Sequence, residues 1–175
     1  SIWYDEAVSL LLAAKDLPAM IAHTAGDIHP PLYYGLLHLW TGVAGASEFS
    51  AGFFSLFWGV LLIPLVFWLG RQVADARAGL LAAFLVAISP YHIWYSQELR
   101  MYTLGACLGL LALWGMWRGL AGGRRSAWGW LVYFLSAAAG MYVLYYFAFL
   151  LIALNLWALA YMLSRPPAAR KGMAR

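Results

Sequence analysis

The sequence is poor in charged residues and has almost no cysteine. Only 10% of its 175 residues are charged, whereas about a quarter are charged in a soluble globular domain. In contrast, 65% are hydrophobic and the mean hydropathy is +0.75. Short segments of alternating hydrophobicity, as in a β-barrel, are missing too. The single cysteine, Cys107, cannot form a disulfide within the chain, so cysteine usage indicates no redox compartment.

The net charge of +4 does not indicate a nucleic-acid partner. In so apolar a chain the basic residues must first be assigned to one or the other side of a membrane. The aromatic residues are expected to face lipid or to pack between helices rather than to stack on bases. No internal repeat or separable second domain is visible, so residues 1–175 are interpreted as one transmembrane domain. Ser1 stands where an initiator methionine would, and we expect a fragment that starts inside a loop.

Long apolar runs follow one another with few charges between them, which is typical of a helical integral membrane protein. A helix needs about 20 mostly apolar residues to cross the hydrocarbon core. We therefore expect an all-α polytopic bundle of five spans, over residues 51–70, 78–95, 99–118, 127–143 and 144–164.

Lysine and arginine residues predict which side of the membrane each connection occupies. They gather after the first, third and fifth spans, and an odd number of spans puts these three clusters on one face. That face is expected to be cytoplasmic, with residues 165–175 as a cytoplasmic tail of a plasma (inner) membrane protein. The clusters are Arg71 and Arg77; Arg118, Arg124 and Arg125; and Arg165, Arg170, Lys171 and Arg175.

Residues 1–50 then form an extracytoplasmic loop with two interfacial helices. "EAVSLLLAAKDL" places Val8, Leu11 and Leu12 on one face at helical spacing. "PPLYYGLLHLWTGVAG" has the same pattern, with prolines in its first turn. The stretch between them, "PAMIAHTAGDIH", is expected to be loop.

Three polar clusters meet at this extracytoplasmic face, where charged groups are costly and often mark function or pairing. Together they could supply a base, a metal or acceptor contact, and a cation for a phosphate. They are Asp5–Glu6, Asp27–Ile28–His29 and Glu98–Leu99–Arg100.

Each cluster also has a purely structural interpretation. Asp5 could cap the first interfacial helix, and Asp27 the helix that starts at Pro30. Ser96 could cap the third span, with Glu98 in its first turn. Arg100 could pair with Glu98 or with a carboxylate of residues 1–50. Alternatively, its guanidinium could hold a lipid phosphate through bidentate hydrogen bonds.

Four motifs resemble, in order, landmarks of a known family. "WYDEAVS", "DIHPPLYYGLLHLW", "SEFSAGFFS" and "SPYHIWYSQELRMYTL" extend from about residue 3 to residue 120. They resemble the GT-C membrane glycosyltransferases of the dolichyl-phosphate-mannose–protein mannosyltransferase type, glycosyltransferase family 39-like. The bacterial aminoarabinose transferase that acts on lipid A belongs to the same superfamily. The resemblance implies an N-terminal fragment, because relatives have a span before the acidic loop and further spans after it.

The resemblance implies that a sugar is transferred from a polyprenyl-phosphate donor to an extracytoplasmic hydroxyl, with inversion. The resemblance leaves open whether the acceptor belongs to a protein, a lipid or a polysaccharide, and whether a divalent cation assists. Asp5 would then be the general base, Glu6 would position it, and Arg100 would hold the carrier phosphate. Glu98 would orient Arg100, and a metal contact of Asp27 and His29 stays open. The residues that would line the cavity are Asp27, His29, Glu98 and Tyr102.

One departure and two alternatives accompany this hypothesis. Tyr145 stands near the position where relatives often have a histidine. A transporter would need ionisable groups near the middle of its spans, and these spans have none there. A non-catalytic membrane scaffold would use the carboxylates only as caps.

Overall fold

The computed structural model describes residues 3–123 and 126–164. Within these residues all regular elements are α-helices, which confirms the predicted all-α class. They are α1 (Tyr4–Ala13), α2 (Leu17–Thr24), α3 (Leu32–Ala44), α4 (Glu48–Val73), α5 (Ala76–Ala87), α6 (Pro90–Gln97), α7 (Tyr102–Ala121), α8 (Ser126–Val143) and α9 (Phe147–Ser164).

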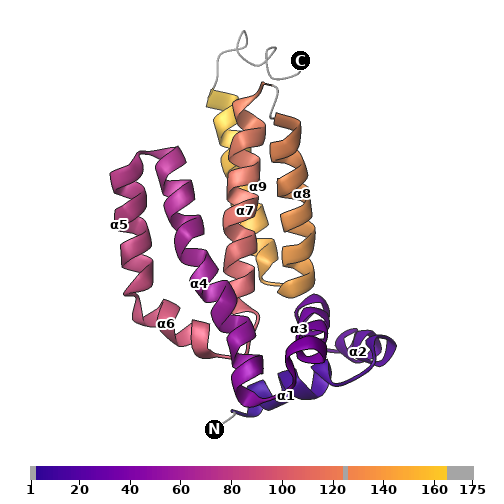
Figure 1. Cartoon of the computed structure of the whole chain (residues 1–175). Coiled ribbons are helices and arrows are strands. Elements are labelled where there is room, and N and C mark those ends of the chain that lie inside the picture. Colours follow the sequence, from indigo (N-terminus) through magenta and orange to yellow (C-terminus); the bar gives the residue numbers. More distant parts are fainter. Residues whose placement is uncertain (1–2, 124–125, 165–175) are drawn as a thin grey trace.

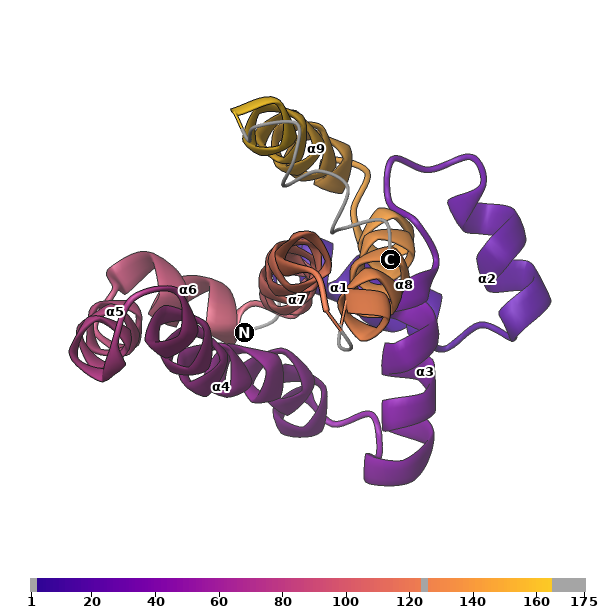
Figure 2. The same ribbon diagram turned by 90° about the horizontal axis from the view of Figure 1, so that it is seen from above.

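The helices form an elongated bundle with a smaller helical layer at one end. Helices α4, α5, α7, α8 and α9 run along the bundle, each in the direction opposite to the one before it (Figure 1). Helices α1, α2 and α3 lie together at one end (Figure 1). Seen along the bundle, α7 stands between the α4–α5 pair and the α8–α9 pair (Figure 2). The chain therefore returns repeatedly to the end that α1–α3 occupy.

Three described helices, α4, α7 and α9, are long and apolar enough to cross a membrane. The count becomes four if α5 and α6, which meet at a bend of 58°, form one broken span. By length and composition the expected five spans are thus not reached. Ser89 caps α6 and Pro90 lies in its first turn, which breaks the expected second span. Helix α8 is long enough, but its mean hydropathy is too low for a span because glycine, serine and aromatic residues interrupt its aliphatic ones.

The N-terminal region contains three helices, so the loop expected over residues 18–29 is wrong in its first part. Helix α2 covers residues 18–24 of it, and residues 25–29 are loop as expected. The Asp16 carboxylate accepts a hydrogen bond from the Ala19 backbone N–H at 3.0 Å, and Pro18 lies in the first turn. The Asp16 cap and Pro18 stabilise the start of α2. The helix is too short to show a clear periodic pattern of apolar residues in the sequence.

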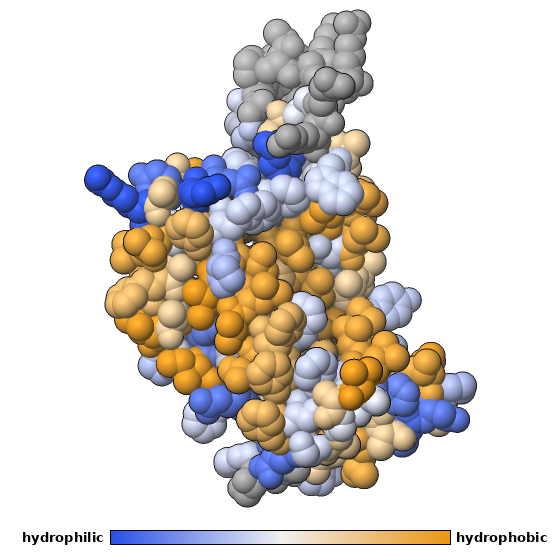
Figure 3. All heavy atoms as spheres, viewed as in Figure 1, coloured by the Kyte–Doolittle hydropathy of each residue, from blue (hydrophilic) through white to orange (hydrophobic). Residues whose placement is uncertain are grey.

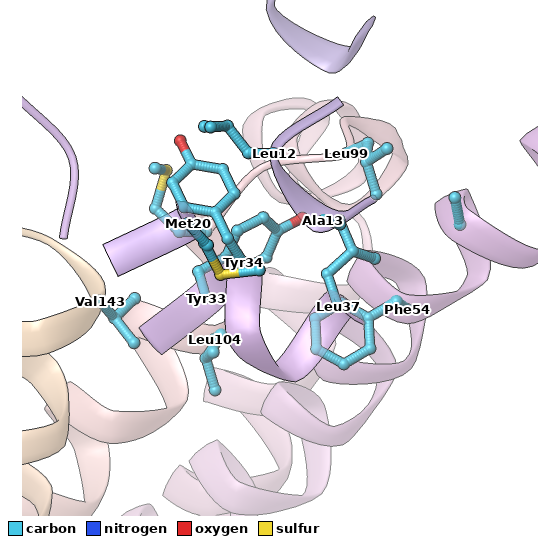
Figure 4. Packing of buried hydrophobic residues seen from close by; sticks show 12 residues of the cluster. Leu12, Ala13, Met20, Tyr33, Tyr34, Leu37, Phe54, Leu99, Leu104 and Val143 are labelled. Carbon is cyan, nitrogen blue, oxygen red and sulfur yellow. The ribbon is translucent and has the colours of Figure 1, made fainter. Parts of the chain in front are cut away.

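A hydrophobic cluster attaches the N-terminal helices to the bundle. Tyr33 and Leu37 of α3 are fully buried, and Leu12 of α1 lies beside them (Figure 4). Phe54 of α4 and Leu104 of α7 complete the contact from the bundle side (Figure 4). Because Leu99 belongs to the same cluster, the segment before α7 is held against the N-terminal helices.

The outer surface agrees with a membrane environment. Large apolar side chains of α4, α5 and α9 are exposed, including Phe57, Phe84 and Ile152. The face in Figure 3 is mostly apolar along the bundle, with polar residues gathered toward its two ends. The basic residues Arg71 and Arg118 lie at the ends of α4 and α7 opposite α1–α3. The remaining predicted basic clusters, Arg124–Arg125 and 165–175, lie outside the described residues.

Candidate active site

A cavity of about 560 Å³ opens at the end of the bundle that carries α1–α3. It lies between the start of α1, the start of α4, the end of α6 and the segment that leads into α7. Its lining includes five of the seven predicted site residues: Asp5, Glu6, Glu98, Arg100 and Tyr102. Asp27 and His29 are not part of the lining, although His29 reaches Arg100.

Asp5 lies in the first turn of α1 and is exposed. Trp3 occupies the N-cap position, so the interpretation of Asp5 as the cap is wrong. Among the described residues, none donates a hydrogen bond to its carboxylate, while its backbone carbonyl accepts one from the Ser9 hydroxyl at 3.0 Å. Asp5 therefore presents a solvated carboxylate to the cavity.

Glu6 uses both of its carboxylate oxygens to bind backbone. Oε2 accepts a hydrogen bond from the Trp3 N–H at 2.9 Å, which satisfies a free donor at the helix start. Oε1 accepts one from the Leu99 N–H at 3.0 Å. Glu6 thus joins α1 to the segment before α7, and Glu6 rather than Asp5 satisfies a backbone donor at the start of α1.

Glu98 contacts a tryptophan rather than the neighbouring arginine. Its Oε1 accepts a hydrogen bond from the Trp94 indole N–H at 2.6 Å. Its backbone carbonyl accepts one from the Arg100 N–H at 2.8 Å. Ser96 lies inside α6 and donates to the His92 carbonyl, so it does not cap the third span. Helix α7 begins at Tyr102, three residues later than expected.

Arg100 is 8% exposed, and no described carboxylate lies within 4.0 Å of its guanidinium. The ion pair considered from the sequence is therefore absent among the described residues. Its Nη2 is 3.1 Å from His29 Nε2, and its charge lies 5.9 Å from the centre of the Tyr102 ring. Its Nε is buried, with no hydrogen-bond partner in the described part of the chain. A buried, uncompensated cation with a free donor favours an anionic ligand.

His29 contacts Arg100, and Asp27 lies beside His29, although neither lines the cavity. His29 Nδ1 lies 3.9 Å from Asp27 Oδ1. The Asp27 carboxylate accepts a hydrogen bond from the Ile28 N–H at 2.6 Å and does not cap α3, whose N-cap is Pro31. Burial, and next the positive charge of Arg100, lower the pKa of His29. Within the described residues, no group of three or more His, Cys, Asp or Glu side chains could hold a metal ion.

A comparison with known families gives the decisive match. The family model described as dolichyl-phosphate-mannose-protein mannosyltransferase matches residues 28–173, well over half of the sequence. The chain belongs to this family. It is therefore a glycosyltransferase of the mannosyltransferase type and an integral membrane protein. No curated protein and no solved structure matches the chain.

The match divides the site residues of this mannosyltransferase into two groups. Asp5, Glu6 and Asp27 precede the matched range, which begins at residue 28. The range also continues well beyond residue 120, where the motif resemblance weakens, and it includes Tyr145, which is exposed between α8 and α9. The predicted site residues inside it are His29, Glu98, Arg100 and Tyr102.

Sequence reasoning missed two groups that shape the site of the mannosyltransferase. The hydroxyl of buried Ser55 lies 3.2 Å from the Tyr33 hydroxyl and donates to the Arg100 carbonyl at 3.3 Å. Ser55 also accepts a hydrogen bond at its own carbonyl from the Thr103 hydroxyl at 3.0 Å. A single serine in an apolar run carries no signal of this. Glu48 lines the cavity, and its place after Ser47 indicates only a helix start.

Proposed function

We propose that this mannosyltransferase transfers a sugar from a polyprenyl-phosphate donor to an extracytoplasmic hydroxyl, with inversion. One observation carries the proposal. The exposed carboxylate of Asp5 and the buried guanidinium of Arg100 line the same cavity, and among the described residues Arg100 has no carboxylate within 4.0 Å. A base and an anion-binding group thus share one space.

Arg100 would bind the phosphate of the donor. A guanidinium offers donors in a planar fork that matches phosphate oxygens, and its Nε is a buried donor without a partner in the described residues. As the bond between the anomeric carbon and the phosphate oxygen breaks, negative charge grows on the leaving phosphate. A fixed cation in a partly enclosed site stabilises that charge more in the transition state than in the ground state.

Asp5 would act as the general base on the acceptor. The acceptor oxygen forms a bond to the anomeric carbon, its proton passes to the Asp5 carboxylate, and polyprenyl phosphate leaves from the opposite side of the carbon. This displacement inverts the anomeric configuration without a covalent enzyme intermediate. Glu6 is less suited to the base role, since both of its oxygens accept backbone hydrogen bonds. It would hold α1 in place so that Asp5 faces Arg100.

The end of the bundle that holds the cavity would face away from the cytoplasm. Arg71, Arg77 and Arg118 lie at the ends of their helices opposite α1–α3. By the positive-inside rule, these residues mark the cytoplasmic side. A lipid-linked donor would then present its phosphate to Arg100 from the outer leaflet, most simply of the plasma membrane.

Sugar transfer by variants of Asp5 tests the proposal. Asp5→Asn removes the base with little change in shape, and we expect transfer of radiolabelled mannose from polyprenyl-phosphate mannose in membranes to fall by at least about 100-fold. Asp75→Asn is the matched control, because Asp75 caps α5 at the far end of the bundle and asparagine caps equally well. Unchanged transfer by Asp5→Asn, at equal membrane content of protein, would remove Asp5 from the mechanism.

A further inference from the structure

The contact between Arg100 and His29 fixes the protonation of the histidine. A guanidinium has five N–H donors and no acceptor. At 3.1 Å between Arg100 Nη2 and His29 Nε2, the ring nitrogen must therefore be the acceptor, and it carries no proton. The proton of the neutral ring is then on Nδ1, which lies 3.9 Å from an Asp27 carboxylate oxygen. Geometry alone thus selects one of the two neutral tautomers.

An acceptor of this kind has a different effect on Arg100 than a carboxylate would have. A carboxylate would orient the guanidinium and also cancel its charge. A neutral imidazole accepts one hydrogen bond and leaves the full positive charge in place. Since Arg100 is 8% exposed and no described carboxylate lies within 4.0 Å, that charge stays available to a ligand in the cavity.

We propose that His29 is a positioning residue that holds Arg100 through its unprotonated Nε2 while leaving the guanidinium charge free for a phosphate group. The phosphate part of this inference rests on the proposed function. The link between His29 and Arg100 stands on its own geometry. Asp27 supports the arrangement from the other side of the ring, because its negative charge favours a proton on the nitrogen that faces it.

The surroundings of His29 keep its ring neutral. The charged groups that act on it are Arg100, Asp27 and Asp5. Burial and then the guanidinium lower the pKa of His29 and outweigh the two carboxylates, so the ring is an acceptor at neutral pH. Tyr34, buried on α3 and subject to the charges of the same three residues, stays protonated because burial raises its pKa to about 12. Acidification would convert Nε2 to a donor and place two cations side by side.

Nitrogen NMR of the protein labelled at its histidines tests the tautomer without any ligand. His23 is an internal reference, because the Lys15 ammonium donates to its Nδ1 at 3.2 Å and thus places the ring proton on Nε2. We expect His29 and His23 to show opposite neutral tautomers at pH 7.5, with signals assigned by His29→Gln and His23→Gln. A proton on Nε2 of His29, or a charged ring at this pH, overturns the proposal.

Binding of farnesyl phosphate, a short polyprenyl phosphate, to the purified protein in detergent tests the consequence. His29→Phe removes the acceptor and should weaken binding about tenfold or more, whereas His29→Gln supplies an amide oxygen and should stay within about threefold of the wild type. His23→Phe, the same change at an exposed histidine, should bind as the wild type does. Binding by His29→Phe as tight as that of the wild type overturns the proposal.

The two experiments separate this inference from the proposed function. If the wild type shows the expected tautomer but does not bind farnesyl phosphate, the polyprenyl-phosphate donor is wrong and the His29–Arg100 link holds. If the wild type binds farnesyl phosphate and the tautomer is the opposite one, the positioning role of His29 is wrong and the proposed donor holds.

Discussion

At the scale of single residues, the two neighbouring acids at the start of α1 have different environments. Asp5 is exposed toward the cavity, and within the described residues its carboxylate accepts no hydrogen bond. Glu6, one position on, accepts hydrogen bonds from two backbone N–H groups, one of them 93 residues away at Leu99. A carboxylate without hydrogen-bond donors can accept a proton, whereas one that already binds two backbone N–H groups stabilises the fold. Substitution of each acid should therefore change a different property of the protein.

We predict that Glu6→Ala destabilises the protein more than Asp5→Ala does. Loss of Glu6 leaves the N–H of buried Leu99 without an acceptor, which costs about 1–3 kcal/mol of unfolding free energy. Asp5→Ala removes only a helix-dipole contribution of about 0.3–1 kcal/mol. Thermal unfolding in detergent, followed by circular dichroism, measures both variants. Equal melting temperatures for the two would contradict this division of roles.

At the scale of elements, a bend shapes the cavity and a close helix contact stabilises the bundle. The 58° bend between α5 and α6, at Ser89–Pro90, turns α6 so that Trp94 and Gln97 line the cavity. The close packing of α7 on α8 stabilises the bundle itself. A side chain at Gly115 would place its Cβ 2.5 Å from the backbone nitrogen of Tyr133, so the two backbones are in contact there.

We predict that Gly115→Ala lowers the stability of the bundle while Gly105→Ala, on the same helix, does not. The new methyl group at Gly115 would force the backbones of α7 and α8 apart, at a cost of about 1–3 kcal/mol. A Cβ at Gly105 meets nothing within 4 Å, and alanine there removes the helix penalty of glycine, a gain of up to about 1 kcal/mol. Midpoints of thermal unfolding in the same detergent compare them, and a lower midpoint for Gly105→Ala than for Gly115→Ala would refute the packing argument.

At the scale of the whole molecule, the bundle separates its charges between two ends. The cavity and α1–α3 occupy one end, and the described basic residues Arg71, Arg77 and Arg118 occupy the other (Figure 1). Polar groups thus gather at both ends of an apolar body (Figure 3). The side of the membrane on which the donor is used follows directly from which end faces the cytoplasm.

We predict that the two ends react with a membrane-impermeant maleimide from opposite sides. In a Cys107→Ala background, Ile28→Cys adds a thiol at the end of the bundle that carries α1–α3, at a position 76% exposed. Ala74→Cys adds one at the exposed far end of α4. The first should be labelled in right-side-out vesicles and the second in inverted ones. The reverse pattern would place Asp5 and Arg100 in the cytoplasm and end the proposed outer-leaflet chemistry.

Part of this site could be predicted from the sequence because it depends on local spacing. The pairs Asp5–Glu6 and Glu98–Arg100 stand beside apolar helices, and their placement at one end of a bundle follows from the number of crossings between them. The partner of Arg100 could not be predicted in the same way. His29 is 71 residues away, and only the fold decides whether a carboxylate, an imidazole or a ligand lies within reach of a guanidinium.

The sequence by itself determined the helical membrane class, the grouping of basic residues and the succession of family motifs. These are properties of residues along the chain: hydropathy, charge and order. Only the tertiary structure decided that Glu6 accepts two backbone hydrogen bonds while the Asp5 carboxylate accepts none from the described residues. It also decided that α6 turns away from α5 and that Arg100 donates a hydrogen bond to a histidine. The reason is physical, since hydrogen bonds form between groups that the packing of distant helices brings within about 3 Å.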